Sequence, residues 1–103
     1  MTNGNVALIA LGDPTRREIL ERLRAGPRAV GEIAAGMTIS RPAVSQHLKV
    51  LKDSGLVAET RQGTRHYFAI APEGLGELRA YLDGLWSDAL AAFARHVERE
   101  RGS

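Results

Sequence analysis

The segment at residues 40–56, SRPAVSQHLKVLKDSGL, is the feature that most constrains how this chain can fold. At 3.6 residues per turn, one side of a helix carries three apolar side chains and one histidine, namely Val44, His47, Leu48 and Leu51. The other side carries hydrogen-bonding and charged side chains, namely Arg41, Ser45, Gln46, Lys49 and Lys52. Ser40 can cap the start of this helix, and Gly55 can end it. The segment therefore predicts a short helix that is fixed to a core through one side and presents donors on the other.

The rest of the chain predicts one small domain at residues 1–103, mainly helical with a small β-hairpin. Its 103 residues leave room for one core, and they contain no internal repeat, linker or low-complexity tract. The helices expected before the hairpin are a short apolar helix at 5–12, a helix opened by Asp13 and Pro14 and closed by Gly26-Pro27, and the two helices of a helix-turn-helix at 30–54.

After residue 56 the period of the sequence changes from that of a helix to that of a strand. The runs VAETR and HYFAI flank Gln62-Gly63-Thr64, which predicts a two-stranded hairpin at 57–70. After Pro72, apolar residues return at helical spacing and predict a long last helix at 73–100.

Two short helices joined by a tight turn, the second polar on its outer side, are typical of a DNA-binding helix-turn-helix. The major groove of B-DNA admits one α-helix and presents distinct donors and acceptors for each base pair. The expected base-reading residues are Arg41, Ser45, Gln46 and Lys49. Ser40 and the helix N-terminus behind it suit a backbone phosphate. The hairpin would be the wing of a winged helix-turn-helix, with Arg61 and Arg65 on the adjacent phosphates or minor groove.

The charge distribution agrees with a polyanionic partner. The formal net charge is only +2, but residues 40–66 hold five basic against two acidic side chains, whereas the remainder holds nine against ten. Such an excess alone is equally typical of a solvated face. It favours DNA binding because it coincides with the helix-turn-helix and the hairpin.

Four stretches together resemble the ArsR-type (ArsR/SmtB) winged-helix repressors: LGDPTRREILERL, VGEIAAGMTISRPAVSQHLKVLKDSGLV, RQGTRHYFAI and GLGELRAYLDGLW. The resemblance runs from about Leu8 to Trp86. It implies a homodimeric cytoplasmic transcriptional repressor that binds a palindromic operator in double-stranded DNA. The DNA-facing positions that it implies are Ser40, Arg41, Ser45, Gln46 and Lys49, with Arg61 and Arg65 in the wing.

The sequence departs from metal-sensing relatives of this family. It has no cysteine, and the place where the family's arsenic sensors carry a cysteine pair reads GEIAAG. The candidate ligands in the last helix are Asp83, Asp88, His96 and Glu100. Only His96 and Glu100, four residues apart, could share a face there, and an isolated pair of this kind is usually solvated. We expect no metal and no cofactor, and the sequence names no effector. A metal-responsive repressor and a protein-interaction module on the same scaffold are the alternatives.

Catalysis and a membrane location are not expected. There is no glycine-rich phosphate loop, and no serine has a base and an acid placed with it. The N-terminal apolar run of six residues is too short for a signal peptide or a membrane span. We expect a cytoplasmic protein that is not an enzyme.

The predicted last helix is too long for the rest of the chain to cover. Its roughly 27 residues would extend about 40 Å, and its apolar far end would stand exposed unless a second chain packs on it. A two-fold axis would bury it together with the apolar first helix. The expected dimer-interface residues are Leu8, Leu82, Trp86, Leu90 and Phe93.

His47 has two possible roles, because it lies near the inward side of the helix at 40–56. A partly buried imidazole that seals this helix against its neighbour is the favoured interpretation, and a phosphate contact is the other.

Overall fold

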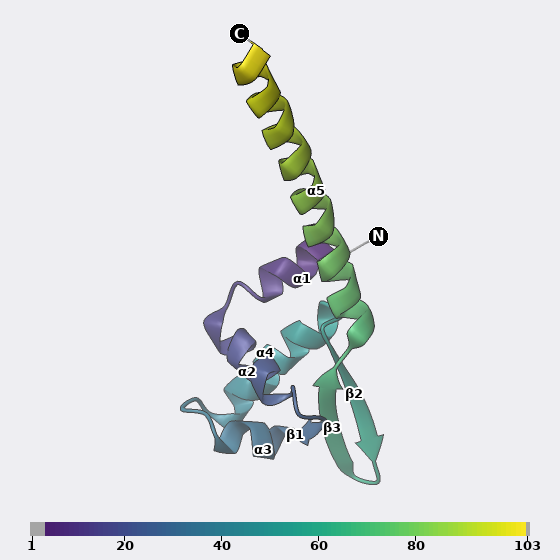
Figure 1. The fold of residues 1–103 in the computed structure, drawn as a ribbon. Helices are drawn as coiled ribbons and strands as arrows, with labels where there is room; N and C mark the ends of the chain where they lie inside the picture. Colours follow the sequence, from purple (N-terminus) through teal and green to yellow (C-terminus); the bar gives the residue numbers. More distant parts are fainter. Residues whose placement is uncertain (1–3, 103) are drawn as a thin grey trace.

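The computed structural model describes residues 4–102 (Figure 1). They form five helices and a β-hairpin in the predicted order, together with one short additional strand. In chain order the elements are α1 (Gly4–Ala10), α2 (Pro14–Arg22), β1 (Arg28–Ala29), α3 (Val30–Ala35), α4 (Arg41–Asp53), β2 (Val57–Gln62), β3 (Arg65–Ile70) and α5 (Pro72–Gly102). The mainly helical fold with a hairpin and a long last helix is confirmed. None of the helices in this part of the chain is long and apolar enough to cross a membrane.

The sheet has three strands rather than the predicted two. Its order is β1-β3-β2, and β1 pairs antiparallel with β3 through Arg28 opposite Phe68 and Ala29 opposite Tyr67. A two-residue strand is too short to show alternation in the sequence, so it forms because the hairpin offers an edge to pair with. The Nε of Arg28 also donates a hydrogen bond of 2.9 Å to the carbonyl of Arg22, which fixes the approach to this strand.

The ends of three helices differ from the predictions. Helix α2 ends at Arg22, before Gly26-Pro27, because Leu23 already takes the cap position. Helix α1 spans Gly4–Ala10 rather than 5–12, and α5 runs from Pro72 to Gly102 rather than over 73–100.

Two predicted helix starts are confirmed in detail. The Oδ1 of Asp13 accepts hydrogen bonds from the amides of Thr15, at 2.7 Å, and Arg16, at 3.3 Å. The Oγ of Ser40 accepts from the amide of Ala43 at 3.2 Å. Helix α4 stops where predicted, because Gly55 adopts φ +83° and turns the chain into β2.

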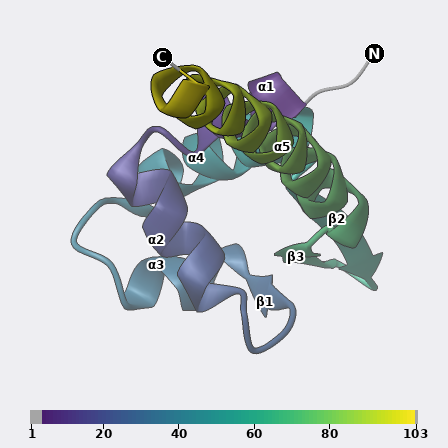
Figure 2. The same cartoon turned by 45° about the horizontal axis from the view of Figure 1, so that its top comes forward.

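The core lies where α1 to α4, the base of the hairpin and the first turns of α5 meet (Figure 2). Its fully buried large side chains are Ile19, Leu23, Ile33, Val44, Leu48, Leu51 and Leu56. Helix α5 joins this core closely, since a Cβ at Gly74 would overlap the carbonyl of Gly55. We call residues 4–78 the body and residues 79–102 the projecting helix.

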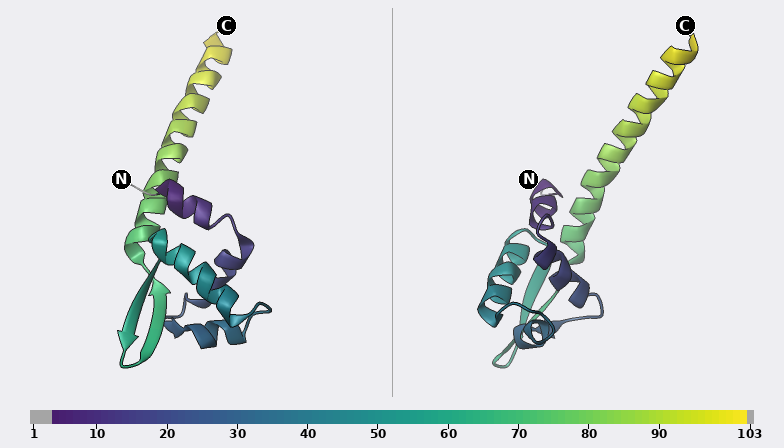
Figure 3. Two further views of the ribbon diagram at one scale, coloured as in Figure 1. Left: turned by 180° about the vertical axis from the view of Figure 1, so that it is seen from behind. Right: turned by 90° about the vertical axis from the view of Figure 1, so that its left-hand side faces the viewer.

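The projecting helix extends away from the body, as Figures 1 and 3 show. The molecule measures 68 × 27 × 22 Å, and its radius of gyration is 18.4 Å. A compact chain of this length would have a radius of gyration of about 13 Å. The excess comes from a helix that has left the body rather than from a loosely packed body.

Candidate nucleic-acid interface

Helix α4 has the two sides that the sequence predicts. Val44, Leu48 and Leu51 are buried in the core. The predicted DNA-facing residues of this helix are all exposed, namely Arg41, Ser45, Gln46 and Lys49. The short helix α3 packs across α4 and, with Ile33 fully buried, holds it in place. A rigid helix therefore presents a row of donors and acceptors to solvent.

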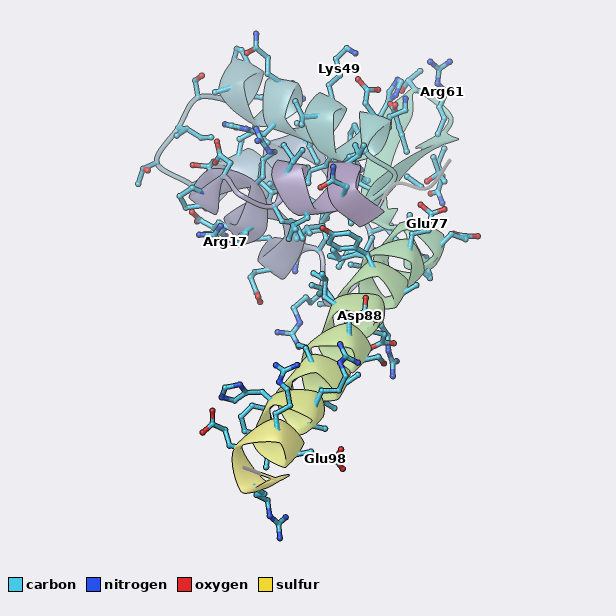
Figure 4. All side chains as sticks on the ribbon, turned by 90° about the horizontal axis from the view of Figure 1, so that it is seen from above. Arg17, Lys49, Arg61, Glu77, Asp88 and Glu98 are labelled. Atoms are coloured by element: carbon cyan, nitrogen blue, oxygen red, sulfur yellow. The ribbon has the colours of Figure 1, made fainter. Side chains whose placement is uncertain are left out.

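The hairpin of β2 and β3, which we call the wing, lies beside α4. Arg61 faces His66 across the two strands, and Gln62 faces Arg65, so both arginines lie next to the tip. Gly63 adopts φ +64°, which the tight turn at this tip requires. The guanidinium of Arg65 sits 5.7 Å from the ring centre of Tyr67, a cation–π distance. Figure 4 shows Lys49 and Arg61 projecting from the same side of the body, opposite to the direction in which α5 extends.

A groove of about 680 Å³ separates the wing from α3 and α4. Three of the predicted residues line it: Arg41 and Ser45 from α4, and Arg65 from the wing. Arg41 leans toward α3, since a Cβ at Gly31 would lie 3.5 Å from its Nη1. A smaller neighbouring hollow of about 290 Å³ includes Lys49 and again Ser45. The two basic elements thus border one continuous concave surface.

Ser40, Gln46 and Arg61 do not line either hollow, although all three are exposed. The hydroxyl oxygen of Ser40 is occupied by its cap hydrogen bond, which leaves its proton to donate. Gln46 and Arg61 have no side-chain hydrogen bond or ion pair within residues 4–102. Their polar groups can therefore be used by a ligand without breaking an existing contact.

Lys49 forms an ion pair of 2.9 Å with Asp53, one turn along α4. Its side chain is 75% exposed, so solvent screens the pair and a phosphate or base can replace the carboxylate at little cost.

Lys52 lies in a network that sequence reasoning missed. Its Nζ donates at 2.8 Å to Oε1 of Glu59 on β2, and Oε2 of Glu59 lies 2.5 Å from Nδ1 of His66 on β3. The hydrogen bond from Lys52, followed by that from His66, lowers the pKa of Glu59, and the same bond raises the pKa of Lys52. The hairpin register could have revealed part of this network, because Glu59 and His66 are diagonal neighbours on one face.

His47 is partly buried, as the favoured interpretation required. Its Nδ1 lies 3.4 Å from Nη1 of Arg16, and because arginine can only donate, this nitrogen is the acceptor. The Nε of Arg16 donates at 2.6 Å to the carbonyl of Ala10, so Arg16 connects α1, α2 and α4. A phosphate contact by His47 stays a prediction.

The candidate ligands of the last helix do not form a cluster. Within residues 4–102, no three His, Asp or Glu side chains lie close enough together to hold a metal ion. This result offers no site for the metal-responsive alternative in a single copy of the described chain.

The predicted dimer residues are all exposed on one chain. Trp86 and Phe93 are each 66% exposed on the projecting helix, and Leu82, Leu90 and, on α1, Leu8 are also exposed. The four on α5 lie at helical spacing along one stripe, and α1 packs on this helix near Tyr81.

A short helix that supports a donor-rich second helix, followed by a basic hairpin, defines a winged helix-turn-helix DNA-binding protein. The comparisons narrow this class. The family model described as "Bacterial regulatory protein, arsR family" matches residues 13–59. The HTH-type transcriptional regulator Rv2034 of Mycobacterium tuberculosis is 52% identical over 91 residues, which cover 88% of this chain and 85% of the relative. The transcriptional repressor SdpR of Bacillus subtilis is 39% identical over 61 residues, covering 59% of this chain and 68% of the relative.

Solved structures agree with the sequence comparisons. An ArsR-like transcriptional regulator from Rhodococcus sp. RHA1 has a TM-score of 0.76 at 27% identity, covering 90% of this chain and 91% of that one. The homodimeric winged helix-turn-helix DNA-binding domain of Mb0332 from Mycobacterium bovis has a TM-score of 0.66 at 35% identity, covering 84% and 80%.

The chain belongs to the ArsR family of transcriptional regulators. The predicted family, the winged helix-turn-helix fold and the absence of an enzymatic function are confirmed by these relatives.

Proposed function

We propose that this regulator is a cytoplasmic homodimeric repressor that occupies a palindromic operator. One observation carries the proposal: Arg41, Ser45 and Lys49 of α4 and Arg65 of the wing line two adjoining hollows, which share Ser45. A duplex that places its major groove on α4 brings its flanking backbone to the wing.

The residues on this surface divide into two roles. Gln46, Ser45 and Lys49 have the reach and the donors to read base edges in the major groove. Arg41 can contact guanine or phosphate and leans toward the groove beside the wing. Ser40, Arg61 and Arg65 fix the register of the protein on phosphates, which carry no sequence information directly.

The dimer is supported by the apolar stripe of the projecting helix. Trp86, Phe93 and their neighbours form a row of large exposed apolar side chains, and a contiguous row of this kind is typical of an interaction surface. The relative from Mycobacterium bovis is homodimeric by its description. Two copies related by a two-fold axis would present their α4 helices about one DNA turn apart, near 34 Å.

Selection of bound sequences from a pool of random duplexes tests the proposal as a whole. We expect the enriched sequences to be inverted repeats whose half-sites lie about one helical turn apart. Enrichment of single half-sites would contradict the dimer, and no enrichment above random duplex would contradict sequence-specific binding.

Two substitutions separate base reading from phosphate contact. Gln46→Ala should weaken binding of the selected operator by about 1–3 kcal/mol and leave binding of random duplex nearly unchanged. Arg65→Ala should weaken binding of both duplexes and reduce the salt dependence of affinity. Fluorescence anisotropy with both duplexes over a salt series measures each effect. An equal loss on both duplexes for Gln46→Ala would remove this residue from the base-reading set.

A further inference from the structure

The network of Lys52, Glu59 and His66 connects the two elements of the DNA-facing surface. Lys52 lies in the last turns of α4, Glu59 in β2 and His66 in β3. Among the described residues, the bond from Lys52 to Glu59 is the only side-chain hydrogen bond between α4 and the wing. The bond from His66 then joins the second strand of the wing to the same carboxylate.

The outer part of the wing has little else to hold its direction. Residues 60–66 are exposed, whereas the inner part of the hairpin is held by buried Val57, by Phe68 and Ile70 against the core, and by the pairing of β1 with Tyr67 and Phe68. Beyond Tyr67 the hairpin has no third strand beside it, so the direction of its outer part can change at small cost. Glu59 lies two residues before Arg61, so a tie at Glu59 acts close to the arginines of the wing.

The charge of Glu59 is otherwise unfavourable on this surface. The carboxylate lines the groove with Arg41, Ser45 and Arg65, where a phosphate backbone would be repelled by it. Its side chain is only 24% exposed, and its pKa is lowered by Lys52 and His66, so it stays ionised. Lys52 and His66 both bind this negative carboxylate on a DNA-facing surface. Affinity for DNA does not explain this arrangement, because the carboxylate repels phosphate.

We propose that Glu59 is a positioning residue for operator binding: by bridging Lys52 and His66, it fixes the angle of the wing to α4, so that Arg61 and Arg65 reach the duplex that α4 reads. This inference rests on the proposed function. Glu59 itself does not contact DNA; it acts through the arginines of the wing.

The direction in which one substitution changes affinity for DNA distinguishes a positioning role from a simple effect of charge. Glu59→Gln removes a negative charge, and electrostatics alone would then tighten binding to any duplex. If Glu59 positions the wing, the substitution should instead weaken binding of the operator selected from the random pool, by about fivefold, the effect of losing one partly exposed ion pair. Unchanged or tighter operator binding by Glu59→Gln would overturn the inference.

Asp53 provides a matched control. It also accepts from a lysine, at 2.9 Å from Lys49, but both partners lie on α4 and do not reach the wing. Asp53→Asn should leave operator affinity unchanged or raise it slightly. A loss equal to that of Glu59→Gln would show that any lost carboxylate on this surface weakens binding, and would also overturn the inference.

A double-mutant cycle tests whether Glu59 acts through the wing. In the Glu59→Gln background the wing arginines are already misplaced, so Arg65→Ala should cost less than it does in the wild-type chain. His66→Leu should weaken operator binding as Glu59→Gln does, whereas His66→Asn, which keeps an N–H near the position of Nδ1, should retain wild-type affinity. Additive losses, or no difference between the two His66 variants, would contradict a positioning role.

Measuring duplex binding by the wild-type protein shows whether the proposed function fails or only this inference fails. If the wild-type protein binds no duplex specifically, the proposed function fails and the inference fails with it. If the wild-type protein binds its operator and Glu59→Gln binds it equally well, only the inference fails. Thermal unfolding of each variant, with a midpoint expected no more than about 4–8 °C below that of wild type for a partly exposed pair, confirms that the wing and body remain folded.

Discussion

The body and the projecting helix are built from similar apolar patterns but end in opposite environments. In the body, Ile19, Ile33 and Leu48 are at most 1% exposed, whereas Trp86 and Phe93 of the projecting helix are 66% exposed. Both regions are helical, and both place apolar residues at helical spacing. The comparison shows that periodicity predicts which side of a helix is apolar, but not what covers that side.

The difference follows from length. The 31 residues of α5 extend about 46 Å at 1.5 Å per residue, while the other two dimensions of the molecule are 27 and 22 Å. Only the first turns of α5 can therefore contact the body, where Gly74 and Leu78 are buried. We expect the body to be stable by itself and the projecting helix to depend on a second copy.

The largest expected effect comes from truncating the same residue type in the two regions. Leu48→Ala leaves a cavity in the body and should lower the free energy of unfolding by about 2–5 kcal/mol at any protein concentration. Leu90→Ala should have an effect only at concentrations where the dimer forms. Urea unfolding at two protein concentrations, a hundredfold apart, measures both. A concentration-independent loss for Leu90→Ala would show that the projecting helix packs within its own chain.

The next largest effect is expected on dimer formation, in a variant whose body stays folded. Trp86→Arg places a charge in the centre of the apolar stripe and should raise the dimer dissociation constant by about a hundredfold or more, the size of an interface hot spot. Asp88→Arg introduces the same side chain away from this stripe and serves as the control (Figure 4). Sedimentation equilibrium measures the association, and circular dichroism confirms that the body stays folded. If both variants remain equally dimeric, the stripe is not the interface.

The smallest expected effect is a loss of stability of the body at acidic pH. Burial raises the pKa of Asp13, but the amides of Thr15 and Arg16 and the charge of Arg16 outweigh it and leave the pKa below the ordinary value of 3.8. As the pH falls, Asp13 is therefore protonated in the unfolded chain before it is protonated in the folded chain. The stabilisation is complete above that ordinary value and is lost as the pH falls through the lower folded pKa. Asp13→Asn keeps a cap acceptor without a titrating group, so its urea midpoint should fall less between pH 5 and pH 2.

Much of the fold could be predicted because it rests on contacts within one or two turns of the chain. The caps at Asp13 and Ser40, the stop at Gly55 and the two sides of α4 all depend on residues at most four apart, and all are observed. Strand β1 could not be predicted, because its pairing partner lies about forty residues further along the chain. The DNA-facing roles of Gln46 and Arg65 agree with the geometry and stay predictions until binding is measured.

The sequence by itself determined the helices, the hairpin, the donor-rich side of α4 and the apolar stripe of α5, because periodicity and capping are local properties of the chain. Only the tertiary structure decided that α4 and the wing border one groove, that Glu59 joins Lys52 to His66, and that the stripe on α5 is left uncovered. These features depend on how distant segments close around a core of limited size. That closure sets which side chains meet and how far the core can reach along a long helix.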